Sequence, residues 1–433
     1  MIKALVSILI CCGVCYAHLA DHVERDFHIY KSSRMLAKFT GRSSSQIDTT
    51  KKIPKKDSQI SMCCVVCHGG PADHFATLLP ELQKRGVQLH IHATPGVMAK
   101  FKDVDLQVDV LNLNNTSLSE IEVARNLAKE CSKVSVLLTD LGNSFEISLQ
   151  QAFKEYNPHV KRLVYYDNPE SYVPGGYSEM AYATIQIADR ALFSNSNLTR
   201  SPLYINKEKE SDLPFDKRFG IGYYPMSRVQ EIRKKRLEEK KTNSMRLKFF
   251  HEHQIQGKDK KILVYFGGNN DEYYKFAFPA FQKFLANSIE QSNLSHLVFV
   301  IHQHPAAKNS NCDWNYIKAW VQEIGSNPKA PTIILSQWDS NQIQTIADCA
   351  LYYQTSMAAQ FALAGIPTMQ VGHEIYEDIL VKNKAIPSIV NTDTLVETLV
   401  KGNWEGSQSD LESLTEYLGI RHDSYEALME AIK

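Results

Sequence analysis

Residues 353–360 read Tyr-Gln-Thr-Ser-Met-Ala-Ala-Gln. This stretch joins an apolar run to a helical pattern, which indicates a strand followed by a helix. It leads into a tight turn at residues 364–367, Ala-Gly-Ile-Pro. One strand–helix unit earlier, residues 301–305 read Ile-His-Gln-His-Pro and follow another short apolar run. Such runs are typical of buried parallel strands, and ligands bind beyond the carboxyl ends of those strands. The two polar clusters therefore predict one shared binding site.

Apolar runs alternate with amphipathic stretches on both sides of this unit. The runs lie at residues 62–67, 87–93, 108–113, 134–139, 162–166 and 191–194, and again at 262–266, 297–301, 332–335, 349–353, 368–371 and 386–389. Strand-length runs separated by helix-length stretches predict βαβ units and a parallel sheet. The pattern stops near Pro225 and restarts after a charged stretch at residues 228–241. We therefore expect an α/β fold with two facing, doubly wound Rossmann-like domains and an interdomain cleft.

The length of the chain agrees with two domains, because 433 residues are too many for one ordinary core. The patterns divide the chain into five predicted segments. These are a signal-like or anchoring hydrophobic segment (1–17), a polar arm or linker (18–60), an N-terminal domain (61–225), a charged helical linker (226–260) and a C-terminal domain with closing helices (261–433).

The first 17 residues resemble a secretory signal. Lys3 precedes an almost wholly apolar stretch, and small residues stand before a cleavage point after Ala17. A plain hydrophobic tail is the alternative. The segment predicts export, membrane association, or a tether on the cytoplasmic face, and these alternatives stay open. The formal net charge is zero, so charge favours neither nucleic acid nor an anionic membrane as a partner.

Cysteines are numerous, nine in all, but three of them lie in the leader. Cys63, Cys64 and Cys67 fall in or beside the first predicted strand. The Cys64-x-x-Cys67 spacing suits redox or zinc chemistry, yet no second pair of this kind follows it. We therefore expect buried free thiols in this strand.

Polar residues follow the first strand of the N-terminal domain. Gly69, Gly70 and Asp73 predict an acceptor-side loop at the start of a helix, where glycines allow close approach and a helix terminus favours an anion. His74 is the first candidate for a general base. The alternative has Asp73 as an N-cap and His74 as a packing residue. Asp140 and Asp167 are rival bases, because each follows a predicted core strand.

The C-terminal domain has the residues expected to bind a nucleotide. Gly267, Gly268 and Asn269 offer backbone amides to a phosphate, and His304, held by Pro305, offers a donor. Hydroxyls and amides before a helix suit a diphosphate, and a simple helix cap is the alternative. The residues of this second group are Thr355, Ser356 and Gln360. His302 and His304 also have the spacing of a metal pair, but no third ligand is near, so we expect neither metal nor cofactor.

Over residues 61–400 the chain resembles the GT-B glycosyltransferases. Gly69-Gly70-x-x-x-His74 is similar to the Gly-Gly-x-Gly-Gly-His loop of the UDP-N-acetylglucosamine transferase of peptidoglycan synthesis, although Ala72 and Asp73 replace its later glycines. Residues 347–367 resemble the donor-diphosphate region of many GT-B enzymes, where Gln360 stands in place of a glutamate that binds ribose.

The dipeptide His304-Pro305 resembles the His-Pro motif of bacterial sialyltransferases and capsule transferases, and UDP-N-acetylglucosamine 2-epimerases also have one. The resemblance implies metal-independent transfer of a sugar from a UDP or CMP donor to the hydroxyl of a glycan or lipid-linked acceptor. Such an acceptor implies peripheral membrane association and envelope or surface polysaccharide synthesis. Two alternatives remain, which are an isomerase like the 2-epimerases and a non-catalytic protein that binds nucleotide or glycan.

Overall fold

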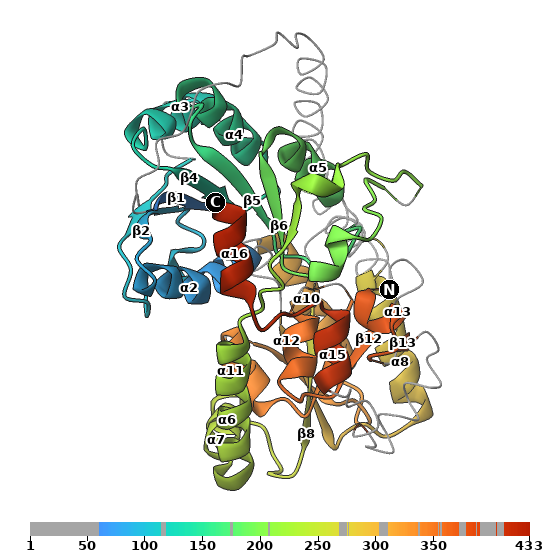
Figure 1. The fold of residues 1–433 in the computed structure, drawn as a ribbon. Helices are drawn as coiled ribbons and strands as arrows, with labels where there is room; N and C mark the ends of the chain where they lie inside the picture. Colours follow the sequence, from blue (N-terminus) through green and yellow to red (C-terminus); the bar gives the residue numbers. More distant parts are fainter. Residues whose placement is uncertain are drawn as a thin grey trace. The chain divides into compact units, whose positions relative to one another are not determined.

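The computed structural model describes residues 60–113, 118–173, 176–206, 208–267, 275, 277–302, 311–336, 338–353, 355, 357–371, 378–386, 388–389, 404 and 411–433; the side chains of 311–317 and 388–389 are outside this description. These residues form two compact units (Figure 1). Of the described residues, the N-terminal unit holds 60–225 together with Leu418–Lys433, and the C-terminal unit holds those between Met226 and Tyr417.

The N-terminal unit is built on a seven-stranded parallel sheet in the order β3-β2-β1-β4-β5-β6-β7. Its strands are β1 (Ser61–Val66), β2 (Gln88–Ala93), β3 (Val108–Val110), β4 (Val136–Thr139), β5 (Lys161–Tyr166), β6 (Arg190–Phe193) and β7 (Arg218–Gly220). Its helices are α2 (Gly69–Lys84), α3 (Glu120–Glu130), α4 (Ser144–Tyr156), α5 (Tyr177–Ile187) and α16 (Ser424–Ile432), with short 3-10 turns η1 (Met98–Lys100), η2 (Ser196–Thr199) and η3 (Phe215–Lys217).

Strand β1 shows why the sheet is covered on both faces. Successive side chains of a strand point to opposite faces. Met62 and Cys64 join the core formed with α2 and α16, whereas Cys63 and Val65 join the core formed with α3 and α4. Both faces are therefore buried, and the sequence reads as one continuous apolar run, as expected for a parallel strand.

The C-terminal unit contains a six-stranded parallel sheet in the order β10-β9-β8-β11-β12-β13. Its strands are β8 (Lys261–Phe266), β9 (Leu297–His302), β10 (Thr332–Leu335), β11 (Cys349–Tyr352), β12 (Thr368–Val371) and β13 (Ser388–Ile389). Its helices are α6 (Met226–Thr242), α7 (Ser244–Glu252), α8 (Phe278–Gln291), α10 (Asn311–Gly325), α11 (Ser340–Ile346), α12 (Ala358–Leu363), α13 (Ile379–Lys382) and α15 (Leu411–Tyr417). Aromatic stacking helps to hold α8 on the sheet, with the ring centroids of Tyr265 and Phe281 3.8 Å apart.

The predicted fold class is confirmed, since each unit is a parallel, doubly wound α/β sheet. Each sheet also has a topological switch point, between β1 and β4 in the first and between β8 and β11 in the second. At such a point the connections leave in opposite directions, and the carboxyl ends of the two strands border a crevice that suits a ligand.

The predicted boundaries differ from the units in two places. The predicted linker begins with α6, but α6 belongs to the C-terminal unit, because the buried Arg236 donates to the carbonyls of Gln344 and Ala347 at 2.6 and 2.7 Å. A cation at these carbonyls is favourable, since they end helix α11.

The closing helices also divide between the units. Helix α16 packs on the N-terminal unit, where Leu428 is fully buried in the core (red in Figure 1). Arg190 of β6 donates to the carbonyl of Ala431 at the end of this helix, at 2.6 Å. The end of the chain thus completes the first unit rather than the second.

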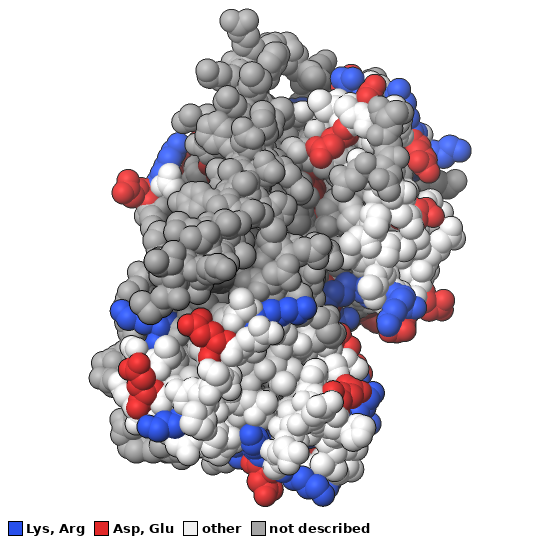
Figure 2. Space-filling view, turned by 180° about the vertical axis from the view of Figure 1, so that it is seen from behind, with Lys and Arg blue, Asp and Glu red and all other residues white. Residues whose placement is uncertain are grey.

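Basic and acidic side chains are interspersed over the described surface seen in Figure 2. Among the described residues, no helix combines the length and the apolarity needed to cross a bilayer.

Candidate functional site

Three titratable residues follow three neighbouring strands of the N-terminal sheet. His68 comes two residues after β1, Asp140 directly after β4, and Asp167 directly after β5. Strand β4 pairs with β1 on one side and with β5 on the other. Because the strands are parallel, these residues meet at the edge that contains the switch point.

Asp140 organises the turn after β1. One oxygen of its fully buried carboxyl group, Oδ2, accepts the backbone N–H groups of Cys67 and His68, each at 2.8 Å. The same oxygen lies 3.1 Å from Nδ1 of the His68 ring. The other oxygen, Oδ1, is buried and has no hydrogen-bond partner among the residues that the structure describes. Buried polar atoms are rarely left unpaired, so this oxygen is a candidate for binding a ligand.

Glu146 adds a second buried carboxyl group from the first turn of α4. Its Oε2 accepts the backbone N–H of Asn143 at 2.8 Å, which forms a capping box at the helix start. Its Oε1 lies 3.6 Å from Nδ1 of His68. Complete burial raises the pKa of Glu146 to about 7, although the nearby His68 charge opposes this. The group is therefore able to take up or release a proton near neutral pH.

Asp167 is the third carboxyl group. The hydroxyl of Tyr177 donates to its Oδ1 over 3.4 Å. Burial raises the pKa of Asp167 to about 6, against the lowering effect of His68. Two carboxyl groups of this cluster thus titrate well above the usual range of exposed carboxylates.

His68 is the cation of the cluster. Burial alone would lower its pKa, but the charge of Asp140 and the hydrogen bond to it, followed by the charge of Glu146, outweigh burial and raise the pKa to about 10. The ring packs against Gly142, where a Cβ atom would approach Cε1 and Nε2 to 3.2 Å. Gly142 has a φ of 136°, so both the space and the backbone favour glycine at this position.

These four side chains (His68, Asp140, Glu146 and Asp167) are hereafter called the acid–base cluster. They include a protonated imidazole and two carboxyl groups, those of Glu146 and Asp167, that titrate near neutral pH. Neighbouring groups whose pKa values are driven apart are the usual basis for paired acid and base roles. The cluster is therefore suited to proton transfer.

The structure corrects the predicted loop at residues 69–73. Gly69 and Gly70 are the first residues of α2, and His68 is its N-cap. Pro71 is tolerated at this point because the first turn of a helix leaves its N–H groups without partners in any case. Asp73 forms an ion pair with Lys100 at 2.8 Å. His74 lies in the second turn, 9% exposed, with its Nδ1 2.6 Å from the Tyr165 hydroxyl.

In the C-terminal unit, the predicted residues are placed only in part, since Gly268, Asn269, His304 and Ser356 lie outside the described residues. The backbone N–H of Gly267 donates to the carbonyl of His302 at 3.1 Å. Thr355 stands before α12, and its Oγ1 accepts the N–H of Met357 at 3.2 Å. Gln360 is buried, and its Nε2 donates to Oε1 of Gln344 at 3.2 Å.

His68 and Glu146 were not predicted from the sequence. His68 could have been identified from its position in the sequence, because it stands between the end of a core strand and the start of a helix. Glu146 reads as an ordinary capping residue three positions after Asn143, and only the tertiary structure reveals its burial.

Comparison with known proteins places the fold in context. No protein-family model matches the sequence, and no curated protein matches it. Among solved structures, the UDP-GlcNAc 2-epimerase of Neisseria meningitidis bound to UDP-GlcNAc is similar, with a TM-score of 0.59 and 13% identity over 86% of this chain and 99% of that chain. The UDP-GlcNAc 2-epimerase of Methanocaldococcus jannaschii, in complex with UDP-GlcNAc and UDP, matches with a TM-score of 0.55 and 13% identity over 82% of this chain and 98% of that chain.

A third similar structure has another activity in its name. The N-terminal domain of the Candida albicans trehalose-6-phosphate phosphatase matches with a TM-score of 0.53 and 12% identity, over 88% of this chain and 97% of that chain. At these identities the likeness concerns the fold, and proteins that share a fold can differ in function. The chain therefore has the two-unit, Rossmann-like fold of the GT-B type that the UDP-GlcNAc 2-epimerases also have.

Proposed function

We propose that this chain is a nucleotide-sugar isomerase of the UDP-GlcNAc 2-epimerase kind, which inverts a sugar carbon without a separate acceptor. The observation that carries the proposal is the acid–base cluster at the carboxyl ends of β1, β4 and β5, in which Asp140 and Glu146 are fully buried. The similar structures that hold UDP-GlcNAc or UDP support a nucleotide sugar as the ligand.

The chemistry of inversion favours such a cluster. Carbon 2 is inverted when a base removes its proton while the C1–O bond to the nucleotide breaks, which leaves a C1=C2 double bond. An acid then returns a proton to the opposite face of carbon 2 as the nucleotide adds back to carbon 1. With a pKa of about 7, Glu146 is present in both forms at neutral pH, and Asp167, with a pKa of about 6, is mostly ionised. The unpaired Oδ1 of Asp140 would accept a hydrogen bond or a proton from the substrate. His68 would act as a donor whose charge lowers the pKa values of Glu146 and Asp167.

The nucleotide would bind the C-terminal unit. The proposed contacts are Gly267, Gly268, Asn269, His304, Thr355, Ser356 and Gln360. Of the side chains in this group that the structure describes, Thr355 is the best placed, because it stands immediately before α12 with a hydroxyl group that is able to donate. His74 would be a positioning residue, which acts on the site through Tyr165.

Glycosyl transfer, the function predicted first from the sequence, has weaker support. Transfer to a hydroxyl needs one base, whereas the cluster contains several groups that differ in pKa. Two of the similar structures described above are also named as epimerases.

Incubation with UDP-GlcNAc in deuterated water separates the two functions. An isomerase should incorporate solvent deuterium at carbon 2 of the sugar and form the epimer with no acceptor present, which proton NMR detects. Asp140→Asn should abolish this exchange, whereas Asp103→Asn, a change of an exposed carboxylate, should leave it unaltered. UDP release only upon addition of a hydroxyl acceptor, without deuterium in the sugar, would instead establish a transferase.

A further inference from the structure

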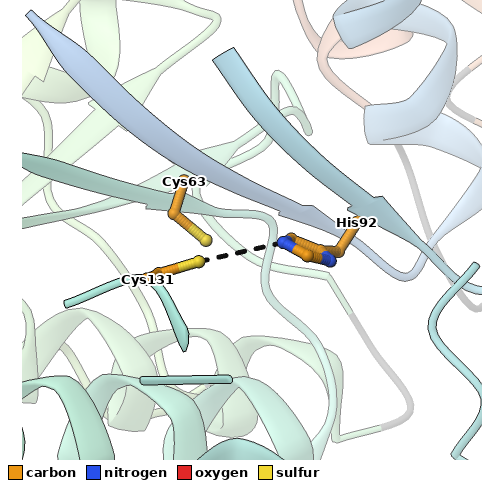
Figure 3. Close-up of side chains that lie close together, drawn as sticks. All are labelled: Cys63, His92 and Cys131. Atoms are coloured by element: carbon orange, nitrogen blue, oxygen red, sulfur yellow. Dashed lines mark hydrogen bonds between the residues drawn. The ribbon is translucent and has the colours of Figure 1, made fainter. Parts of the chain in front are cut away.

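Cys63, His92 and Cys131 lie close together (Figure 3), and Cys63 and Cys131 belong to the core that the N-terminal sheet forms with α3 and α4. Cys63 comes from β1, His92 from β2, and Cys131 follows the last residue of α3. In the β1–β2 register, Val65 is opposite His92, so Cys63 and His92 are two positions apart on the same face. Three separate elements thus bring these side chains together.

The separations within this group are close to those of metal ligands. The two sulfur atoms and the nearer His92 nitrogen all lie within 4.8 Å of one another, and Nε2 of His92 is 3.8 Å from Sγ of Cys131. In a tetrahedral zinc site, Zn–S bonds of about 2.3 Å and Zn–N bonds of about 2.0 Å place the ligand atoms roughly 3.5–3.8 Å apart. A contraction of about 1 Å or less would therefore complete the site.

The three side chains are almost closed to solvent. Cys63 is fully buried and Cys131 is only 6% exposed, so a lone thiolate there lacks the solvation that exposed charges receive.

We propose that Cys63, His92 and Cys131 form a zinc site that joins β1, β2 and the end of α3. On binding, Zn²⁺ would displace the thiol protons of Cys63 and Cys131 to solvent and coordinate two thiolates and a neutral imidazole. The two negative charges balance the metal, so the buried group becomes neutral overall. The fourth position would be filled by a water molecule. The site would stabilise the N-terminal unit, and it does not depend on the proposed isomerase activity.

Metal content tests this proposal directly. The full chain, dialysed against Zn²⁺ and then against metal-free buffer, should retain about one zinc per chain, and the midpoint of thermal unfolding should rise with bound zinc. His92→Gln and Cys131→Ser should lose the zinc and the thermal shift. Cys64→Ser is the matched control, because Cys64 is a fully buried neighbour on the opposite face of β1. Equal zinc retention by all four proteins would overturn the site.

A second measurement needs no variant and so does not depend on how well a variant folds. Bound Co²⁺ should give a thiolate-to-cobalt charge-transfer band, and Zn²⁺ should slow the alkylation of Cys63 and Cys131 relative to Cys67, as read by peptide mass spectrometry. A disulfide between Cys63 and Cys131 in the purified protein that excludes zinc, or alkylation rates that zinc leaves unchanged, would contradict the proposal.

Discussion

The two sheets share a topology but differ in what stands at the carboxyl ends of their strands. In the N-terminal unit, those ends carry His68, Asp140 and Asp167, and the charge of Asp140 helps to raise the pKa values of both His68 and Asp167. In the C-terminal unit, the described side chains after β11 include the neutral Thr355 and Gln360. In the same unit, the buried Asp378 is the N-cap of α13 and accepts a hydrogen bond from the Tyr352 hydroxyl.

In our proposal, the same architecture holds reactive groups in one unit and binding groups in the other. Buried charges destabilise a fold unless they are paired, so a cluster of titratable groups with shifted pKa values is typical of a functional site. Helix termini and hydroxyls suit the recognition of a phosphate at much lower cost. We therefore propose proton transfer for the N-terminal unit and nucleotide binding for the C-terminal unit.

Arg236→Ala should have the largest effect on stability and should act on the C-terminal unit. Removing the buried guanidinium leaves the carbonyls of Gln344 and Ala347 without their donor, which should cost about 3 kcal/mol. Urea unfolding followed by hydrogen exchange should show lost protection in the C-terminal sheet. Arg233→Ala, at an exposed position on the same helix, should cost under about 0.5 kcal/mol. Equal losses in both sheets would argue against α6 as part of the C-terminal unit alone.

Asp167→Asn should sharpen the assignment of chemistry to the N-terminal unit. An amide cannot exchange a proton as a carboxyl group does, so the rate of solvent deuterium incorporation into UDP-GlcNAc should fall by about 100-fold. This loss corresponds to about 2.7 kcal/mol in the activation barrier. The affinity for UDP, measured by calorimetry, should not change. A variant with weaker UDP binding and an intact turnover rate would reverse the assignment.

His68→Gln should flatten the dependence of stability on pH. The pKa of His68 is raised in the folded protein from 6.5 to about 10, so its contribution to stability is complete below pH 6.5 and is lost as the pH rises toward 10. Denaturant unfolding should show that the free energy of unfolding falls more for the wild type than for the variant between about pH 6 and about pH 9.5. His159→Gln, a change of an exposed histidine, is the control. Parallel pH curves for His68→Gln and the wild type would count against the ionised cluster.

Thr355→Val should have the smallest effect and should act on binding alone. The change removes the hydroxyl that accepts the Met357 N–H and, in our proposal, donates to the nucleotide. We expect UDP affinity to fall by roughly 5-fold, since one hydrogen bond contributes about 1 kcal/mol. Calorimetry with UDP measures this directly, with Thr242→Val on α6 as the control. Unchanged affinity would remove Thr355 from the binding group.

Much of the fold could be predicted from the sequence, because strands buried on both faces give unbroken apolar runs. The run at residues 62–67 predicts β1 to within one residue, and the run at 262–266 predicts β8 equally well. Strand β7 is only three residues long and begins with Arg218, so it has no such run. The return of α16 to the first unit depends on the packing of Leu428, a contact that is distant in sequence.

Candidate site residues could be predicted where their position directly after a core strand was enough to identify them. Asp140 and Asp167 stand directly after core strands, and parallel strands align their ends. The prediction of His74 as the base rested on a motif. It did not foresee that α2 begins at Gly69, which leaves His68 beside the carboxyl groups as the N-cap. Burial of Glu146 arises from the packing of α4 and has no local sequence signal.

Solvent deuterium exchange at carbon 2 of UDP-GlcNAc, compared between the wild type and Asp140→Asn with UDP affinity measured on the same preparations, tests the central claim most directly. We predict exchange without an acceptor for the wild type, a loss of about 100-fold or more for the variant, and the same affinity for UDP. A wild-type protein that binds UDP yet exchanges no deuterium, or a variant that exchanges at the wild-type rate, would contradict the claim.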